Sequence, residues 1–388
     1  MKPLQNTTPI APGATIGLLG GGQLARMTAL AARDMGYRIA LLDPDPRCAA
    51  APLADLVIAA PFDDADAARR LARQSDVVTY EIERIAPEVL HAVAESGLLR
   101  PGAEVLLRIQ DRGRQKRWLA SKGYPLGPWR PVESARDLEV AVTELGPCRA
   151  KRCFGGYDGR SQLRVTGPSE ADHAFHQLGG SSVAEQELQL ALELSVLVAR
   201  TPDGHAVAHP PALNWHEDAV LSRTLFPAPI SPVLARQATD LALSLAAELE
   251  VQGLLVVELF VTAAGELLVN ELAPRPHNTF HGVGAACATG QFEQYARAIC
   301  GLPLGAVEPH GASVLVNLLG DLWSDQPPRF DTVLRIPGVS VHLYGKEPRP
   351  KRKVGHLVAR GSNGEVALAR AEAAERALGL GPAERAAM

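Results

Sequence analysis

The chain has 388 residues, of which 46% are hydrophobic and 21% charged, and its formal net charge is -4 at pH 7. This length predicts two or three domains, and so small a negative charge gives no support for binding nucleic acid or an anionic membrane. Five cysteines without a CxxC pair are typical of a reducing compartment rather than of a disulfide framework or a zinc site. Because there is also no signal-peptide pattern and no run of the ~18 apolar residues that a membrane helix needs, we expect a cytoplasmic protein.

The first part of the chain alternates apolar strands with helices. Buried strands are predicted at residues 15–19, 38–43, 55–60 and 76–80, and a helix at 23–35. This alternation predicts right-handed βαβ units and a parallel sheet. The domain is expected to end near Pro101, and one helical segment is expected to follow at 104–122.

The remainder of the chain mixes β-prone and helical segments. Strands are predicted at residues 148–151, 254–261 and 266–272, and a longer β-rich segment at 312–359. Helices are predicted at 235–249 and beyond Val366, where alanine, glutamate and arginine are frequent.

A glycine cluster separates the first predicted strand from the first helix. Gly20-Gly21-Gly22-Gln23-Leu24-Ala25 matches G-x-G-x-x-A, and Asp43 ends the second strand. This arrangement is typical of a dinucleotide site, in which glycines let backbone amides approach a phosphate. A tight turn without a ligand explains the same residues equally well. An NAD-dependent oxidoreductase is therefore one functional alternative.

A second glycine-rich loop follows Lys151 and reads Arg152-Cys153-Phe154-Gly155-Gly156-Tyr157-Asp158-Gly159-Arg160-Ser161. Its closely spaced glycines allow backbone amides to wrap around a polyphosphate, and Lys151 adds a positive charge beside them. Such a loop can close over a ligand and exclude water. The alternative is a flexible hairpin turn, but Lys151 together with Tyr157 and Asp158 favours a functional loop.

Two glutamates are predicted to face each other. If Ala264 and Gly265 form a two-residue hairpin turn, Glu258 lies opposite Glu271. Carboxylates in such positions are within ~5 Å of each other and repel, unless one is protonated or a cation lies between them. Magnesium binds one or two carboxylates together with substrate phosphates, and Asn270 adds a neutral polar group. The alternatives are an exposed hairpin with solvated ends and a bulge that shifts the register by one residue.

Two further polar segments suit anions. Arg275, His277 and Asn278 lie in a turn stiffened by two prolines, and a guanidinium can bind a planar carboxylate or bicarbonate through two hydrogen bonds. The basic stretch 346–356 is interrupted by prolines and a glycine, which suits a phosphate site. An ordinary polar loop and a solvated basic face are the respective alternatives.

Together these segments resemble one family closely, the ATP-grasp 5-(carboxyamino)imidazole ribonucleotide synthetases of purine biosynthesis. The matching segments run in family order across nearly the whole chain: GGGQL at 20–24, TYEIE at 79–83, QDR at 110–112, GGYDG at 155–159, VELFV at 257–261, NELAPRPHN at 270–278 and YGKEPRP at 344–350. Such a set is far more specific than any single motif.

The resemblance implies an α/β ATP-grasp fold. A Rossmann-like parallel-sheet domain would span 1–111, a small lid domain 112–190, and a large α+β domain with a β-rich C-terminal extension 191–388. It also implies a homodimer that uses ATP and Mg²⁺. Bicarbonate and 5-aminoimidazole ribonucleotide would be joined through carboxyphosphate, giving the N-carboxylated nucleotide, ADP and phosphate.

The same resemblance implies roles for individual residues. ATP would be contacted by Arg112, Lys151, Gly155, Gly156, Tyr157, Asp158, Gly159, Arg160, Ser161, Glu185, Gln186, Glu187, Leu188, Glu193, His216, Asn270 and Glu271. Magnesium would be held by Glu258 and Glu271. The aminoimidazole nucleotide would be bound by Gln23, Leu24, Glu81, Tyr157, Asp158, Lys346 and Arg352. Bicarbonate or carboxyphosphate would be positioned by Arg275, His277 and Asn278, which complete a catalytic set with Tyr157 and Asp158.

The chain departs from the family pattern at a few positions. Ala25 and Ser161 stand where glycines are common, and after Asn278 the usual Ser-Gly-His-Trp is replaced by Thr279-Phe280-His281-Gly282. We expect the last change to reshape the bicarbonate side. Two further alternatives are a related ATP-grasp ligase that activates formate for a glycinamide nucleotide and a non-catalytic nucleotide-binding module. The motif at 344–352 argues against the first of them.

Overall fold

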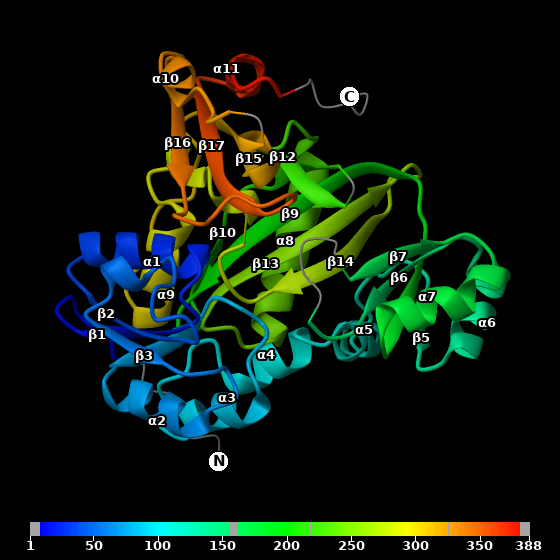
Figure 1. Ribbon diagram of the computed structural model, residues 1–388, viewed down its shortest axis with the longest axis horizontal. Helices are drawn as coiled ribbons and strands as arrows, with labels where there is room; N and C mark the ends of the chain where they lie inside the picture. The colour runs from blue at the N-terminus through cyan, green and yellow to red at the C-terminus, as the bar shows by residue number, and fades with distance from the viewer. Residues whose placement is uncertain (1–7, 156–160, 218, 325, 381–388) are drawn as a thin grey trace.

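The computed structural model of the protein describes residues 8–155, 161–217, 219–324 and 326–380. These residues form a four-stranded parallel sheet, a second four-stranded sheet and a nine-stranded sheet. In Figure 1 the parallel sheet lies at the left in blue and the second small sheet at the right in green, with the long strands of the nine-stranded sheet between them. Within the described ranges, no helix combines the length and the apolar character needed to cross a lipid bilayer.

The parallel sheet has the strand order β3-β2-β1-β4. Its strands are β1 (Thr15–Leu19), β2 (Arg38–Asp43), β3 (Leu56–Ala59) and β4 (Val77–Tyr80). Successive side chains point to opposite faces, so Ile16 and Leu18 join one core cluster while Leu19 joins another. Burial on both faces explains why these strands are unbroken apolar runs. All four predicted strands are confirmed to within one residue at each end.

Helices cover both faces of the parallel sheet. Helix α1 (Gln23–Asp34) packs on one face, and α2 (Ala65–Arg73) and α3 (Pro87–Ala94) pack on the other. A short 3-10 helix, η1 (Ala51–Leu53), follows β2. The helix predicted at 23–35 is confirmed and ends one residue early.

The single helix predicted at 104–122 is wrong, because two helices occupy this range. They are α4 (Ala103–Ile109) and α5 (Arg112–Ser121). Asp111 separates them: its backbone is extended, and its carboxylate accepts a hydrogen bond from the Arg114 N–H at 2.8 Å. The N–H of Arg112 donates to the Cys153 carbonyl at 2.9 Å, which ties the start of α5 to the glycine-rich loop.

The second four-stranded sheet has the order β5-β8-β6-β7. Its strands are β5 (Trp129–Val132), β6 (Cys148–Arg152), β7 (Gln162–Val165) and β8 (Ser182–Gln186). Helices α6 (Ala135–Leu145) and α7 (Ala171–Leu178) pack against it, and a 3-10 helix, η2 (Pro168–Glu170), precedes α7. Strand β6 confirms the prediction at 148–151. Five predicted site residues lie outside the described residues: Gly156, Tyr157, Asp158, Gly159 and Arg160.

The nine-stranded sheet has the order β14-β13-β9-β11-β12-β15-β17-β16, with β10 beside β9. Its strands are β9 (Leu190–Arg200), β10 (Ala206–Ala208), β11 (Ala212–Glu217), β12 (Val220–Phe226), β13 (Gly253–Thr262), β14 (Leu267–Ala273), β15 (Ala312–Leu319), β16 (Val339–Leu343) and β17 (Lys353–Gly361). The β-rich segment predicted at 312–359 is therefore confirmed as β15, β16 and β17.

Two helices pack on opposite faces of the large sheet. Helix α8 (Pro232–Glu248) belongs to one core cluster, and α9 (Gln291–Cys300) to the cluster that also contains α1 and β1. Helix α9 thus lies between the large sheet and the parallel-sheet block, and Figure 1 shows it beside α1. The hydroxyl of Tyr295 on α9 donates to the carbonyl of Tyr80 on β4 at 3.1 Å.

The remaining helices are short or terminal. They are η3 (Asn278–Phe280), η4 (Val283–Ala285), η5 (Gly320–Trp323), α10 (Phe330–Val333) and α11 (Gly364–Ala377). The helices predicted at 235–249 and beyond Val366 are confirmed as α8 and α11, and each begins two or three residues before its predicted start. The side chains of Ser231 and Asn363 cap α8 and α11 by accepting from backbone N–H groups in their first turns.

The turn between β13 and β14 differs from the prediction. The N–H of Thr262 donates to the carbonyl of Glu266 at 2.9 Å, so the turn has three residues rather than the two, Ala264 and Gly265, that were predicted. Gly265 has φ +84°, the left-handed conformation that a three-residue hairpin turn requires at this position.

A bulge in β14 compensates for the longer turn. Leu259 pairs with Val269, but Glu258 pairs with Glu271, so Asn270 is an extra residue on β14. The two shifts cancel each other. The predicted facing of Glu258 and Glu271 is therefore confirmed, although the turn from which it was deduced is wrong.

Candidate functional site

A hollow lies between the second small sheet and the edge of the large sheet. It is lined by residues from α5, the loop before β5, the end of β8 and the β13–β14 hairpin: Lys116, Gly127, Pro128, Glu185, Gln186, Leu188, Phe260, Val269 and Asn270. Leu188, Phe260 and Val269 give it apolar walls, and its polar lining residues are Lys116, Glu185, Gln186 and Asn270. Apolar walls with a few polar groups suit a planar ring that carries hydrogen-bonding atoms.

The basic end of this hollow contains two lysines and one carboxylate. Glu185 lies 3.0 Å from the Lys116 ammonium and 2.8 Å from the Lys151 ammonium. Burial of Glu185 would raise its pKa, but Lys151 and Lys116 outweigh burial and lower that pKa to about 2. Two ammonium groups share one carboxylate, which leaves positive charge available for an anion.

The structure adds Lys116 to the residues predicted from the sequence. Its side chain is 5% exposed, and burial lowers its pKa against the opposing effect of Glu185. Lys116 lies one helical turn after Arg112 on α5, so both side chains project toward the same side. That four-residue spacing is the sequence signal that could have identified it.

The facing glutamates form the acidic end of the site. The bulge brings Asn270 to the same face as Glu271, and the Asn270 amide donates to a Glu258 oxygen at 3.1 Å. The Arg112 guanidinium lies 2.7 Å from Glu271, and His277 Nε2 lies 3.4 Å from Glu258. The Lys151 ammonium is 3.4 Å from the Asn270 side-chain oxygen and so connects the two ends.

The two glutamates differ in their acidity. Burial, and then the negative charge of Glu271, raise the pKa of Glu258 to about 7. Burial would also raise the pKa of Glu271, but the Arg112 guanidinium outweighs it and lowers that pKa. In the absence of a cation, the repulsion between the carboxylates is thus relieved by a proton on Glu258 near neutral pH. A metal ion between the carboxylates would replace that proton.

The donor set fits a hard cation such as magnesium. Its oxygen ligands would be Glu258 and Glu271, and magnesium usually keeps other positions for phosphates and water. In the part of the chain that the structure describes, no group of three or more histidine, cysteine, aspartate or glutamate side chains could hold a metal by itself.

Two other predicted residues lie beside the acidic end. His216 on β11 is 2.9 Å from Glu193 on β9. Burial would lower the pKa of His216, but the hydrogen bond to Glu193 outweighs it and raises that pKa. Glu193 pairs in register with Phe260, which lines the hollow. A hydroxyl-rich group next to a ring in the hollow would therefore be within reach of both side chains.

The side chains of Gln186 and Glu187 point elsewhere. The Gln186 amide donates to the Leu145 carbonyl at 2.8 Å. Glu187 pairs with Arg149 at 3.2 Å and with Arg164 at 2.7 Å, on an exposed surface of the second small sheet. These side chains therefore have protein partners.

The first glycine cluster is occupied by carboxylates of the protein itself. Glu81, at the end of β4, accepts from the N–H groups of Gly22 at 2.8 Å and of Leu24 and Ala25 at 3.2 Å. Asp43 accepts from the N–H of Gly21 at 2.7 Å. A dinucleotide would need these amides for its phosphates. The structure thus argues against the oxidoreductase alternative.

The glycines permit this close approach. A Cβ atom at Gly22 would lie 2.5 Å from a Glu81 oxygen, and Gly20 has φ +99°. Burial raises the pKa of Glu81, and the hydrogen bonds from Gly22 and Ala25 partly offset that rise. The cluster is thus built to hold a carboxylate at the N-terminus of α1.

Gln23 faces the basic segment near the C-terminus. The Lys346 ammonium donates to the Gln23 side-chain oxygen, although the two residues are 323 positions apart. The same ammonium lies 5.9 Å from the centre of the Tyr344 ring. Arg352 donates to the Glu347 carbonyl at 3.1 Å within the same segment. Of the two predicted phosphate residues, Lys346 therefore contacts the start of α1.

Arg275 and His277 lie between this segment and the acidic end. The Arg275 guanidinium pairs with Glu83 at 2.5 Å, and His277 contacts Glu258. Glu83 was not among the predicted residues, although it belongs to the TYEIE segment. The Asn278 amide donates to the Asn317 side chain at 2.9 Å in a buried position.

The side chain of Phe280, one of the departures from the family pattern, is buried in the core. Phe280 is 1% exposed, and its ring packs 6.3 Å from Phe226 and 6.5 Å from His209, centre to centre. It fills the core beneath the turn. Phe280 itself is therefore a core residue, and the expected effect of the changes at 279–282 on the bicarbonate side stays a prediction.

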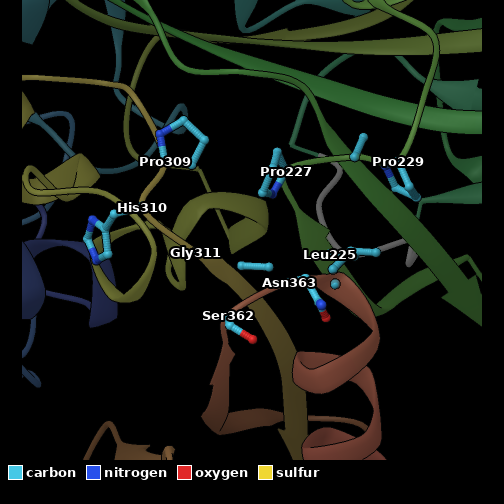
Figure 2. Close-up of a pocket in the computed structure, with 11 residues that line it drawn as sticks. Leu225, Pro227, Pro229, Pro309, His310, Gly311, Ser362 and Asn363 are labelled. Carbon is cyan, nitrogen blue, oxygen red and sulfur yellow. The ribbon is translucent and has the colours of Figure 1, made fainter.

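A separate hollow of about 500 Å³ lies at the end of β12 and the start of α11 (Figure 2). Its lining is mostly proline, glycine and apolar side chains, with His310, Ser362 and Asn363 as its polar members. None of its lining residues belongs to the acidic pair or the lysine cluster. Without charged side chains it does not suit a nucleotide phosphate.

Three family models match the chain. The ribonucleotide synthetase preATP-grasp domain matches residues 13–110, the ATP-grasp domain 117–292, and the phosphoribosylaminoimidazole carboxylase C-terminal domain 313–370.

Several similar sequences and structures are named as N5-carboxyaminoimidazole ribonucleotide synthases or synthetases. The N5-carboxyaminoimidazole ribonucleotide synthase of Bacillus subtilis is 40% identical over 90% of this chain and 92% of its own length. The enzyme of the same name from Brucella melitensis is 39% identical over 90% of this chain and 97% of its own length. A crystal structure of such a synthetase with ADP has a TM-score of 0.88 and 40% identity, covering 95% of this chain and 97% of the other. The structure of the Aspergillus clavatus enzyme in complex with ADP and 5-aminoimidazole ribonucleotide has a TM-score of 0.87 and 28% identity. The match covers 94% of this chain and 98% of the other.

Proposed function

Because the chain belongs to the N5-carboxyaminoimidazole ribonucleotide synthase family of ATP-grasp ligases, we propose that it carboxylates 5-aminoimidazole ribonucleotide with bicarbonate and ATP in purine biosynthesis. The products are 5-(carboxyamino)imidazole ribonucleotide, ADP and phosphate. The observation that carries the proposal is the facing pair Glu258 and Glu271 beside Lys116 and Lys151. The pair needs a cation and the lysines need an anion, and magnesium with nucleotide phosphates provides both.

The chemistry explains why ATP is consumed. Bicarbonate is a poor electrophile because hydroxide leaves badly from its carbon. Transfer of the terminal phosphoryl group of ATP to a bicarbonate oxygen gives ADP and carboxyphosphate. The exocyclic amine of the imidazole then forms a bond to the activated carbon, directly or after release of carbon dioxide in the closed site, while phosphate leaves and the amine loses a proton. The protein contributes positioning, charge neutralisation and exclusion of water rather than a covalent nucleophile.

The hollow at the basic end is proposed to hold the nucleotide. The adenine ring would lie between Leu188 and Phe260, and the ribose would lie near Glu193 and His216. Lys116 and Lys151 would turn from Glu185 toward the phosphates, because both ammonium groups already contact Glu185, which lines the hollow. Other residues proposed to contact ATP are Arg112, Gly155, Ser161, Asn270 and the main chain of 186–187, together with residues 156–160, which lie outside the part of the chain that the structure describes.

Glu258 and Glu271 are proposed to hold magnesium. Bound there, the ion would neutralise charge that develops on the reacting phosphates. The protein's own part is to keep the two carboxylates opposed, and a bound ion would displace the proton from Glu258. Asn270 donates a hydrogen bond to Glu258, and Arg112 forms an ion pair with Glu271.

The acceptor nucleotide is proposed to bind where α1 meets the basic segment. Lys346 and Arg352 would take its phosphate, and Gln23 and Glu81 would border the imidazole and ribose. Arg275 and His277 would hold bicarbonate and then carboxyphosphate, since Glu83 already orients the guanidinium. The Asn278 side chain is paired with Asn317 and would support the turn from below.

Three broader statements also belong to this proposal. We propose that the domains span 1–111, 112–190 and 191–388, in line with the three separate sheets. We propose a cytoplasmic location, which the five free and buried cysteines support. We propose a homodimer because of the family resemblance.

An ADP-release assay tests the proposed function. The purified protein with magnesium and ATP should release ADP slowly, faster with bicarbonate, and much faster once 5-aminoimidazole ribonucleotide is added. The carboxylated nucleotide should appear in step with ADP by rapid anion-exchange chromatography. Protein carrying Glu271→Gln, purified in parallel, should lose this release and so exclude a contaminating ATPase.

The alternatives give different results in the same assay. Stimulation by formate with glycinamide ribonucleotide, and not by bicarbonate with the aminoimidazole nucleotide, would identify the formate-activating ligase. Binding of ATP without turnover in any combination would identify a non-catalytic module. Either result would overturn the proposal.

A further inference from the structure

A buried polar network lies behind the proposed acceptor site. It consists of Tyr344, His356, His281 and Gln291, from four different parts of the C-terminal half of the chain. Tyr344 is 1%, His356 2% and Gln291 1% exposed. The proposed chemistry assigns none of these side chains a contact with substrate.

The contacts within this network are short. The Tyr344 hydroxyl lies 2.6 Å from His356 Nδ1. The His356 ring lies 5.0 Å from the His281 ring, centre to centre, and His281 Nδ1 lies 2.7 Å from the Gln291 amide nitrogen. The ring of His342 on β16 stacks on His356 at 4.7 Å. His356 is therefore enclosed on several sides by polar or aromatic groups.

Each end of the network reaches a loop that carries proposed site residues. Tyr344 lies two residues before Lys346, and the Lys346 ammonium lies over the Tyr344 ring. His281 follows the 3-10 turn that begins directly after His277, and its N–H bonds to the Asn278 carbonyl at 3.2 Å. The network thus joins the phosphate side of the acceptor site to the side where bicarbonate would be activated.

We propose that His356 is a positioning residue that, through the Tyr344 hydroxyl and the His281 ring, fixes the Lys346 segment relative to the His277 turn. The inference rests on the proposed function, because both loops are assigned to substrates there. Its consequence is that the amine of the acceptor nucleotide is held in line with the activated carbon.

Other features support an imidazole in this place over an apolar side chain. A buried tyrosine hydroxyl without a hydrogen-bond partner is costly, so His356 Nδ1 has a specific task as the partner of Tyr344. Burial, and then the nearby His342 and Lys353, lower the pKa of His356 to about 3, which keeps the ring neutral. A neutral ring can share a proton with the tyrosine hydroxyl without adding charge behind the phosphate site.

Loss of this alignment should uncouple the reaction. Carboxyphosphate decomposes when the amine does not capture its carbon, and ATP is then consumed without product. The ratio of carboxylated nucleotide to ADP is therefore a direct measure of positioning. A residue with a purely structural role would change the amount of folded enzyme but would leave that ratio unaltered.

The test compares matched variants of the full-length protein. Tyr344→Phe removes the hydroxyl and keeps the ring beneath Lys346. His356→Leu removes the acceptor nitrogen, whereas His356→Asn keeps an acceptor near the position of Nδ1. Tyr124→Phe is the control, because the Tyr124 hydroxyl bonds to Ser244 at 3.0 Å on another surface. Thermal unfolding of each variant is measured alongside its kinetics.

We expect Tyr344→Phe and His356→Leu to raise the KM for the acceptor nucleotide roughly threefold to tenfold, the range of one lost hydrogen bond. The KM for ATP should stay within about twofold, and the ratio of product to ADP should fall well below the wild-type ratio. His356→Asn should restore most of that ratio, and Tyr124→Phe should match the wild type. Because the two residues share one bond, combining Tyr344→Phe with His356→Leu should add little to either change alone.

The results separate this inference from the proposed function. If wild-type protein makes no carboxylated nucleotide, the proposed function fails. If the wild type makes it and Tyr344→Phe, which alters least, keeps the wild-type ratio and KM, the positioning role is wrong. An equal fall in the ratio of product to ADP in His356→Asn and His356→Leu would also overturn the positioning role. The hydrogen-bonding atom at this position would then have no effect on the ratio.

Discussion

The two ends of the proposed nucleotide site contain the same acidic residue type in opposite circumstances. At the basic end, Glu185 lies between Lys116 and Lys151. At the acidic end, Glu258 faces Glu271, and of these two it is Glu271 that pairs with an arginine. Glu185 is a single carboxylate with two ammonium partners, whereas the two carboxylates of Glu258 and Glu271 share one arginine.

The acidity of these buried carboxylates follows their partners. The pKa of Glu185 is lowered to about 2, although burial opposes this, while burial and the charge of Glu271 raise the pKa of Glu258 to about 7. Burial is common to both, so the balance of neighbouring charge decides the direction. The basic end thus has more positive than negative side chains, whereas the acidic end holds a proton on Glu258 that a cation could displace. A magnesium-bound nucleotide would bring the complementary charge to both ends at once.

Removing a carboxylate from the acidic end should have the largest effect. Glu271→Gln removes a proposed magnesium ligand next to the reacting phosphates, and we expect the kcat for ADP release to fall at least ~100-fold. Glu266→Gln, in the exposed turn of the same hairpin, is the matched control and should keep wild-type turnover. Near-normal kcat in Glu271→Gln at saturating substrates would refute the metal role.

Removing a lysine from the basic end should weaken nucleotide binding. Lys116→Met and Lys151→Met each delete a charge that is proposed to bind the phosphates, so we expect the KM for ATP to rise roughly tenfold or more. The KM for the acceptor nucleotide should change little. Lys122→Met, whose ammonium pairs with Glu248 on the surface after α5, is the control. An unchanged ATP KM in both variants would show that the basic end does not bind phosphate.

The acidic end could be predicted from the sequence for a reason that was partly accidental. A two-residue turn at Ala264 was assumed, whereas the hairpin has a three-residue turn and a later bulge at Asn270. The two differences cancel, so the predicted pairing of Glu258 with Glu271 is right. Turn length has a local signal in Gly265, but a bulge depends on what β13 and β14 pack against. The bulge is also what brings Asn270 to the face that carries the site.

The basic end could be predicted only in part. Lys151 has a local signal because it precedes a glycine-rich loop, whereas Lys116 is one of several basic residues along a helix predicted at the wrong length. Asp111 caps α5 and divides that helix, and this division sets the direction of the Lys116 side chain. Glu83 was missed for a similar reason, since its partner Arg275 is distant in the sequence. By contrast, the parallel sheet was predicted almost completely, because continuous apolar strands are local patterns.

The raised pKa of Glu258 gives a prediction for stability. The ordinary pKa is 4.5 and the folded-state pKa is about 7, so between these values the folded protein binds more protons than the unfolded chain. Without magnesium and nucleotide, the free energy of unfolding should therefore fall as pH rises through this window and stay lower above it. Glu258→Gln is neutral at every pH and should be more stable than wild type at pH 8 by on the order of 1–2 kcal/mol.

Chemical denaturation between pH 5 and pH 8 measures this difference. The advantage of Glu258→Gln should shrink toward pH 5 and should disappear at pH 8 when magnesium and ADP are added, because ligand then stabilises only the wild-type site. Glu266→Gln should follow the wild-type curve. A stability gap independent of pH would mean that the substitution acts by packing and not by charge.

The smallest effect is expected for Glu187, and it distinguishes the number of cationic partners of a carboxylate from the burial of those partners. Glu187, like Glu185, pairs with two cations, Arg149 and Arg164, but those arginine side chains are 43% and 54% exposed, whereas Lys116 is 5% exposed. Glu187→Gln should change the KM for ATP less than twofold and the free energy of unfolding by less than about 0.5 kcal/mol, because water screens exposed pairs. Glu185→Gln should lower stability more, since it leaves two ammonium groups without their carboxylate in a buried place. Unfolding and kinetic measurements on both variants test this difference. If Glu187→Gln lowered stability and ATP binding as much as Glu185→Gln, the number of cationic partners alone would determine the effect of each carboxylate. Burial of the partners would then not be needed to explain it.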